Sequence, residues 1–254
     1  MFVQNSNSIL HRATWVLWLL GVSAFGWGQS NWDDMEGVDA LQMMPKAFVS
    51  NDRMLTAKVN DLASWYDEEY QESYVLVGCE NGTAFFKMLP GGVPVYMGKL
   101  PTASVSSLWR DIKVIHHHAY IVSEAPLHGT QIFDLTALRQ WEPSDGPLEW
   151  EVDALTSGPS VAHNAVSFEE SGQLILVGSN WMGGGAVIFD VTSPETPQLL
   201  GGASEWGYFH DAHALIYDGP DVEHAGKHLL FAAGESGLFI LDITDASDIS
   251  LIAE

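Results

Sequence analysis

A short apolar segment led by glycine occurs four times in this chain, and this repeat constrains the fold more than any other feature. The four segments begin at Gly82, Gly129, Gly185 and Gly237, spaced 47, 56 and 52 residues apart. Upstream of each segment lies a second apolar run, and upstream of that a polar dipeptide: Asn60-Asp61, Arg110-Asp111, His163-Asn164 and His210-Asp211. The second dipeptide residues are 50, 53 and 47 apart, so two independent markers keep the same spacing. The pattern predicts four copies of one structural unit.

Each copy has the pattern of a small antiparallel sheet. The glycine-led segment ends at an aspartate such as Asp190 or Asp242, and Thr, Ser or Pro follows, which favours a turn because Asx side chains bind backbone amides two residues on. A weaker fourth strand follows the turn. Four-stranded units repeated at about 40 to 50 residues are typical of β-propeller blades. We therefore predict an all-β fold, a β-propeller of four-stranded antiparallel blades with four repeats visible, at about 59–105, 106–158, 159–205 and 206–254.

The first 28 residues have the layout of a secretory signal peptide. His11 and Arg12 precede an apolar run from Ala13 to Phe25, and small residues follow at Gly26 and Gly28. The run is too short for a stable membrane span. We expect export from a bacterial cell with cleavage near Gly28, no membrane span afterwards, and a protein that is secreted or at the cell surface; an uncleaved anchor is the alternative. Residues 29–58 form an N-terminal segment with a candidate closing strand at Met54 to Val59.

The charge balance and the single cysteine exclude several classes of function. Asp and Glu number 33 against 10 Lys and Arg, a formal net charge of -23 that repels nucleic acid phosphates. We therefore expect no nucleic acid partner. Cys79 has no second cysteine to pair with, so neither an intrachain disulfide nor a thiolate metal cluster can form. Its apolar setting favours a small buried hydrophobe over a reactive thiol.

Several motifs resemble one known family. The runs VND, ENGTAFF, SLWRDIKV, YIVSEA, AHN, VGSN, GYFHDAHALIYDGPD and FILDIT, in this order over about residues 54–252, are similar to those of the choice-of-anchor B family of secreted bacterial proteins with LVIVD-type propeller repeats. The resemblance implies further repeats and a C-terminal surface anchor, whereas this chain stops at Glu254. We expect an incomplete member, whose four blades form an open arc unless they close unusually or pair with another chain. An open arc would favour oligomers.

The polar dipeptides are the first candidate site. The first strand of each propeller blade lines the central channel, which would gather these residues on one rim: Asp61, Arg110, Asp111, His163, Asn164, His210 and Asp211. Imidazole and carboxylate groups suit zinc, manganese or iron, so a divalent metal held by His163, His210 and Asp211 is the candidate cofactor. Alternatively, the side chains bind backbone groups at the strand starts and tie the blades together, with Arg110 pairing with Asp111 or a neighbouring aspartate. Ligand atoms within about 5 Å of one another would favour the metal.

Three other groups of residues also have two interpretations each. The aromatic residues Trp109, Trp181, Trp206 and Tyr208 form a ligand-contacting surface or pack between blades. The histidines at 116–118 bind metal or form a solvated turn between strands. The loop with Asp218, Asp221, Glu223 and His224 is a solvated acidic hairpin or a calcium loop, although its spacing does not match an EF-hand.

These observations favour a binding protein over an enzyme. We expect an exported β-propeller binding or scaffold module at the cell surface or outside the cell, with an unknown extracellular protein or glycan as partner. The sequence contains no Gly-x-Ser-x-Gly nucleophile elbow. The alternative is a metal-dependent hydrolase or lyase with its site on the channel rim, because propellers host both kinds of function.

Overall fold

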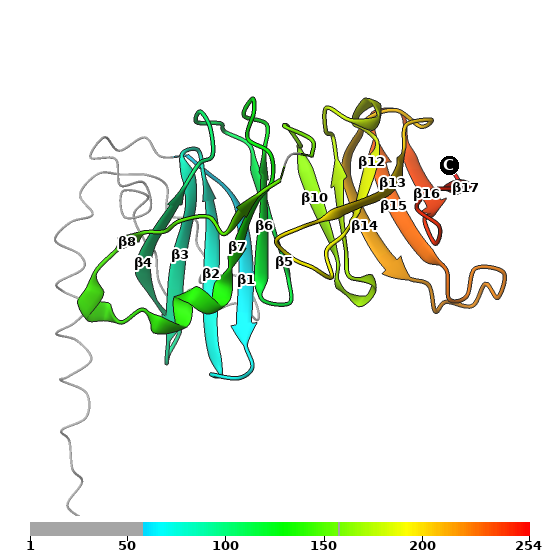
Figure 1. Ribbon diagram of the computed structural model, residues 1–254. Helices are drawn as coiled ribbons and strands as arrows, with labels where there is room; N and C mark the ends of the chain where they lie inside the picture. The colour runs from blue at the N-terminus through cyan, green and yellow to red at the C-terminus, as the bar shows by residue number, and fades with distance from the viewer. Residues whose placement is uncertain (1–57, 157) are drawn as a thin grey trace, which may run out of the picture. The chain divides into compact units, whose positions relative to one another are not determined.

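Four separate β-sheets make up the part of the chain that the computed structural model describes, residues 58–156 and 158–254, all within one compact unit. The predicted signal peptide and nearly all of the segment 29–58, with most of its candidate closing strand, lie outside these residues. The all-β prediction is confirmed: each sheet has four or five strands, and all strand pairs are antiparallel except one in the first sheet. The strands of one sheet follow one another along the chain, with a single exception in the first sheet (Figure 1).

The strand bounds are as follows. The first sheet contains β1 (Val59–Asp67), β2 (Glu72–Cys79), β3 (Gly82–Leu89), β4 (Val93–Pro101) and β8 (Leu148–Glu149). The second contains β5 (Arg110–Ile115), β6 (His118–Ser123), β7 (Gln131–Asp134) and β9 (Ala154–Leu155). The third contains β10 (Asn164–Phe168), β11 (Gln173–Val177), β12 (Ala186–Asp190) and β13 (Gln198–Ala203). The fourth contains β14 (Phe209–Ile216), β15 (His228–Gly234), β16 (Leu238–Asp242) and β17 (Ser250–Ala253).

Strand β8 is the exception to the sequential order. It comes from the stretch between β7 and β9 of the second sheet, yet it pairs in parallel with β4 of the first sheet, Gly98 opposite Leu148 (Figure 1). Two short 3-10 helices, η2 (Leu135–Gln140) and η3 (Pro143–Asp145), carry the chain from β7 to β8. The second repeat therefore contributes one strand to the sheet of the first, which joins the two sheets through backbone hydrogen bonds.

Apolar side chains from consecutive sheets pack face to face. Because successive residues of a strand point to opposite faces, one strand can serve two interfaces. In β5, Ile112 belongs to the core shared with the first sheet, whereas Ile115 belongs to the core shared with the third. A further core joins the third and fourth sheets through residues such as Phe168 and Phe209, both fully buried. Burial of such side chains stabilises each sheet by roughly 1.5 to 3 kcal/mol per residue.

The glycines that lead the third strands have a steric cause. A Cβ added at Gly82 would lie 2.3 Å from the carbonyl oxygen of Leu100, and one at Gly185 would lie 2.0 Å from that of Ala203. Both carbonyls belong to the fourth strand of the same sheet, so the third and fourth strands approach each other too closely for any side chain at this point. At Gly237 a Cβ would meet open space, so this glycine is not required by packing.

The predicted Asx turns after the third strands are confirmed. In three sheets the aspartate that ends the strand accepts a hydrogen bond from the amide two residues later: Thr136 to Asp134 (2.9 Å), Thr192 to Asp190 (2.8 Å) and Thr244 to Asp242 (3.1 Å). In the third sheet this amide holds the pKa of Asp190 below its ordinary value. The turn is thus fixed by the sequence pattern Asp-x-Thr itself.

Candidate functional site

The polar dipeptides connect each sheet to the next one along the chain. Asp61 Oδ2 in the first sheet accepts a hydrogen bond from the amide of Ile112 in the second (2.8 Å). Asp111 Oδ2 in the second accepts one from the amide of Ala165 in the third (2.7 Å). The amide side chains act in the same direction as donors: Asn60 Nδ2 to the carbonyl of Arg110 (2.8 Å), and Asn164 Nδ2 to the carbonyl of His210 (3.3 Å). We call these contacts the inter-sheet clasps.

Asp111 is the most buried carboxylate of the clasps. Its side chain is 8% exposed, and besides the Ala165 amide it binds Lys113 Nζ at 2.7 Å. Burial raises the pKa of Asp111 to about 6, because removal from water disfavours the charged form more than Lys113 and the amide favour it. The carboxyl therefore titrates near neutral pH while it holds the third sheet.

Arg110 does not pair with Asp111, so that part of the prediction is wrong. Neighbouring residues of a strand point to opposite faces, and the Arg110 guanidinium turns to the other side of β5. It is 1% exposed and donates to the carbonyl of Cys79 (2.9 Å) and to Thr102 Oγ1 (2.8 Å). Its third contact is His128 Nε2 at 2.8 Å. All three are neutral acceptors, so burial lowers the pKa of Arg110 to about 10.

His128, which the sequence did not single out, is the fully buried partner of this guanidinium. Its Nδ1 lies 2.8 Å from the carbonyl oxygen of Gly129. An acceptor there requires hydrogen on Nδ1, which leaves Nε2 as the acceptor for Arg110. Burial lowers the pKa of His128 to about 4, so the ring is neutral in the folded protein at pH 7.

His163 and His210 come together although they lie on different sheets. Their Nε2 atoms are 3.0 Å apart and their ring centroids 4.3 Å apart. Glu124 Oε1, from the residue after β6, lies 2.5 Å from His163 Nδ1. When both rings are neutral, His163 Nδ1 donates to the carboxylate and its Nε2 accepts from His210. Residues from three consecutive repeats thus form one chain of polar contacts.

The third predicted metal ligand, Asp211, does not join the histidine pair. Asp211 Oδ1 accepts from the amide of its neighbour Ala212 (2.8 Å), and Asp111 lies at the interface between the second and third sheets. Over residues 58–156 and 158–254 the structure contains no group of three His, Cys, Asp or Glu side chains arranged to hold a metal ion. Of the three proposed ligands, the structure thus brings His163 and His210 together and leaves Asp211 apart.

Glu124 could have been found from the sequence through strand register. The first and second strands of a repeat are antiparallel, so the end of the second lies beside the start of the first, as Ser123 lies opposite Arg110. A polar residue just after the second strand therefore belongs to the same end of the sheet as the dipeptides. Glu124 occupies that position in the run YIVSEA.

The four candidate aromatic residues have different environments. Trp109 is 49% exposed, and its ring lies 6.3 Å from that of His163. Trp181 is also exposed, whereas Trp206 packs against the core between the third and fourth sheets. Tyr208 is partly buried and lies so close to Gly178 and Gly184 that a Cβ on either would meet its ring or hydroxyl within 3 Å. Trp109, His163 and His210 thus form a row of rings, one from each of three consecutive repeats.

The other sequence predictions concern loops and the cysteine. His116 and His117 form the turn between β5 and β6, as expected for a solvated turn, and His116 has φ +52°. Glu169 Oε1 binds this turn through both the amide and Nδ1 of His116 (2.9 Å each). The loop around Asp221 connects β14 to β15 as an exposed hairpin. Cys79 is fully buried, and burial raises the pKa of its thiol, which suits a structural hydrophobe.

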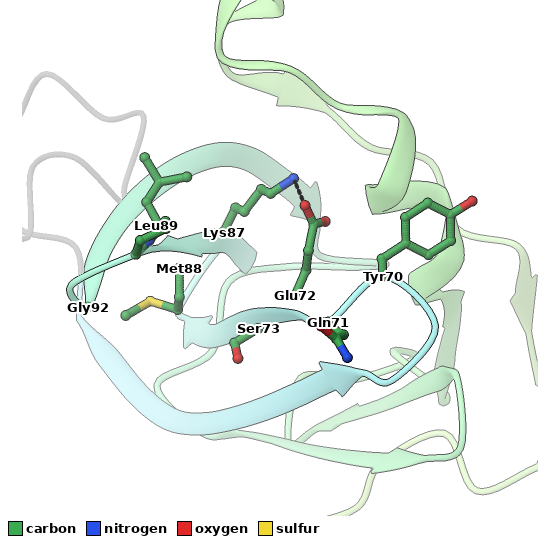
Figure 2. Close-up of a pocket in the computed structure, with 9 residues that line it drawn as sticks. Tyr70, Gln71, Glu72, Ser73, Lys87, Met88, Leu89 and Gly92 are labelled. Carbon is green, nitrogen blue, oxygen red and sulfur yellow. Dashed lines mark ion pairs between the residues drawn. The ribbon is translucent and has the colours of Figure 1, made fainter.

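Two surface hollows accompany these features. One, of about 510 Å³, lies beside the turns that follow β1 and β3 (Figure 2). Across it, Lys87 Nζ binds Glu72 Oε1 at 2.6 Å, as the dashed line in Figure 2 marks, and Glu72 also accepts from the Tyr74 hydroxyl. The second, of about 630 Å³, is lined by His116, Glu169 and Thr192 among others. Each hollow contains one such pair, Lys87 with Glu72 in the first and His116 with Glu169 in the second.

Comparison of the sequence with models of known protein families gives no match, and comparison with curated proteins gives none. The resemblance to the choice-of-anchor B family therefore stays an expectation from the motifs. No helix within the described part of the chain is long and apolar enough to cross a membrane.

Proposed function

We propose that this chain is an exported binding or scaffold module whose four sheets are blades of a β-propeller of the choice-of-anchor B type. The row of rings Trp109, His163 and His210 carries the proposal. These rings lie at the same end of three consecutive repeats, beside Glu124, and two of the three residues are exposed. A shared surface built from several repeats is the usual form of a binding site on a repeat protein.

The inter-sheet clasps support a scaffold role for the polar dipeptides that form them. They fix the start of each first strand to the next sheet, so the rings that adjoin them in the chain hold constant positions. A binding surface gains affinity when its side chains lose little freedom on contact with the partner. Asp61, Asp111 and Asn164 therefore act as positioning residues, and Trp109, His163 and His210 as the contact residues of the binding surface.

The chemistry of the row favours an extracellular glycan over a protein as the first partner to test. The exposed Trp109 ring offers an apolar face against which the C–H groups of a sugar can pack. His210 and Glu124 add polar atoms that can bind hydroxyl groups. The net charge of -23 selects against strongly anionic polymers.

A panel of immobilised neutral polysaccharides and oligosaccharides tests this proposal. We expect the purified protein to bind members of the panel and Trp109→Ala and His210→Ala to weaken that binding by about tenfold or more, as for central contact residues. Leu199→Ala, at an exposed site on β13, is the matched control and should bind as the wild type does. Unchanged binding by both variants would contradict the assignment of the row.

A metal-dependent hydrolase or lyase is the second candidate, favoured by the 3.0 Å separation of His163 Nε2 and His210 Nε2. Two nitrogens bound to one tetrahedral zinc ion at about 2.0 to 2.1 Å lie about 3.3 Å apart, so a small separation of the two rings would admit the metal. Glu124 on His163 Nδ1 matches the carboxylate that commonly orients a metal-bound imidazole. If this candidate is right, zinc or manganese raises the melting temperature of the wild type but not of His210→Gln; no shift in either protein counts against it.

Export is tested separately, in the bacterium that carries the gene. We expect the mature protein outside the cytoplasm with an N-terminus close to Gln29, because the apolar run ends at Phe25 and small residues follow. Cell fractionation and N-terminal sequencing measure both properties. A full-length chain retained in the cytoplasm would contradict the signal peptide assignment without affecting the binding test.

A further inference from the structure

The fourth sheet has two faces, and only one of them packs against another described sheet. Its inner face, with Ala214, Leu230 and Phe239, belongs to the core shared with the third sheet. Its outer face carries Phe231, Ala233 and Ile240, which alternate with the inner residues along the same strands. Phe231 and Ile240 are only partly buried, and Ala233 is exposed.

The equivalent residues of the third sheet lie in the hydrophobic core between the third and fourth sheets. Strand register aligns Phe231 and Ile240 with Ile175 and Ile188, which lie opposite each other on β11 and β12. Ile175 and Ile188 are fully buried because the fourth sheet covers them. The outer face of the fourth sheet therefore has the apolar pattern of an inter-sheet interface, and residues that fill such interfaces elsewhere in the chain are here at the surface.

On this outer face, the aspartate that corresponds to the clasp aspartates binds its own strand and not another described sheet. Asp211 occupies the position of Asp61 and Asp111, whose carboxylates each hold an amide of the next sheet. Within residues 58–156 and 158–254, the Asp211 carboxylate accepts a hydrogen bond from the amide of Ala212 in its own strand. The side chain is exposed and can accept a second donor.

The first sheet presents the matching side along β1, whereas on β3 the same face is already buried, with Ala84 and Phe86 0% and 3% exposed. Leu62 on β1 occupies the position of Ile112 and Ala165, whose amides are the donors in the clasps. Leu62 is 67% exposed, and Tyr66, on the same face of β1, is 56% exposed.

We propose that the outer face of the fourth sheet binds the first sheet of a second copy of this chain, with Asp211 of one copy accepting the Leu62 amide of the other. The contact is head to tail, because the two surfaces are different faces of one molecule. The choice of partner follows from the three interfaces within the chain, each of which joins a polar side chain of a dipeptide to the main chain of the following sheet. Asp61 and Asp111 accept from an amide, and Asn60 and Asn164 donate to a carbonyl. The copies repel through their net charge of -23, so added salt should strengthen the association.

Sedimentation of the full chain over a range of concentrations and at low and high salt tests the proposal. We expect concentration-dependent assembly that increases with salt. Leu238→Glu, at a 54% exposed site on the outer face of the fourth sheet, and Leu62→Glu, on the first sheet, should each remain monomeric. Asp211→Ala should weaken association by about tenfold, the effect of losing one hydrogen bond to a charged group. Leu199→Glu, on neither face, should assemble as the wild type does.

Mixing the two blocked variants gives the decisive result. Leu238→Glu retains an intact first sheet and Leu62→Glu an intact fourth sheet, so an equal mixture should form dimers and nothing larger. A wild type that is monomeric under all conditions overturns the proposal. So does a mixture that fails to pair while the wild type assembles, because that result would mean that each copy uses the same face. Both substitutions are at exposed sites, and circular dichroism should show that each variant is folded.

Discussion

Substitution of Asp111 separates the two effects of a buried clasp carboxylate, the hydrogen bond that it accepts and the charge that it carries. Asp111→Asn removes the charge and keeps an oxygen for the Ala165 amide, whereas Asp111→Ala removes both. Ala165 is 1% exposed, so without an acceptor its amide loses its partner away from water. An unsatisfied buried donor costs about 1 to 3 kcal/mol. Asp111→Ala should therefore be less stable than Asp111→Asn by that amount.

The charge is expected to act in the opposite direction. The pKa of Asp111 is raised from 3.8 to about 6 in the folded state, so the folded protein binds more protons than the unfolded chain between these values. Stability from this group therefore increases as pH falls from 7 towards 4, and at pH 7 the ionised carboxylate costs about 3 kcal/mol. Asp111→Asn should be more stable than the wild type at pH 7, and the difference should shrink as the pH approaches 4.

Thermal unfolding at several pH values measures both effects. For a chain of this size 1 kcal/mol corresponds to about 2 to 4 °C, so the alanine and asparagine variants should differ by roughly 2 to 12 °C in melting temperature. Asp221→Ala, in the exposed β14–β15 hairpin, is the surface control and should stay within about 0.5 kcal/mol of the wild type. Equal melting temperatures of Asp111→Ala and Asp111→Asn would refute the clasp, and a pH-independent difference between Asp111→Asn and the wild type would refute the buried charge.

Three further predictions use other contacts. Burial lowers the pKa of His128 from 6.5 to about 4, so between these pH values the unfolded chain binds a proton that the folded protein does not. The free energy of unfolding should therefore fall by about 3 kcal/mol as the pH drops from 6.5 to 4. His128→Gln should lack this contribution in urea unfolding, and a variant with the same pH slope as the wild type would contradict it. Arg139→Ala leaves the fully buried Asp67 without its bidentate partner (2.6 and 2.9 Å) and should cost about 3 kcal/mol in urea unfolding, so wild-type stability would disprove the assignment. Gly185→Ala should cost about 1 to 3 kcal/mol through its clash with the Ala203 carbonyl while Gly237→Ala stays near neutral, and similar melting temperatures for the two variants would argue against a steric role.

The strand pattern could be predicted because it depends on residues close together in the chain. The glycine-led strands, the Asp-x-Thr turns and the turn at His116 are local, and each is present in the structure. The side to which Arg110 points depends on the register of its strand relative to two other sheets, and the prediction of an Arg110–Asp111 pair ignored the alternation along β5. The crossing of β8 to the first sheet had no local signal, because two residues pair with a strand about 50 positions earlier.

Part of the candidate site could be predicted for the same reason. Equivalent positions in successive repeats meet in space, which is why His163 and His210 were expected near each other and are. Asp211 belongs to the same alignment but faces away from the third sheet, so repeat position alone did not show that its carboxylate would stay with its own strand. Glu124 and His128 lie outside the aligned dipeptides, and they join the network only through side chains that reach across from the end of β6 and the loop that follows it.

The clasps have a consequence for how such a chain can evolve. In every clasp one partner is a side chain and the other is a main-chain amide or carbonyl, which any non-proline residue supplies. A repeat that is duplicated, lost or exchanged therefore finds a compatible neighbour without a second, compensating mutation. Repeat number can change by recombination while the sequences of the receiving strands drift, and only the short polar residue at the start of each first strand remains under selection for assembly.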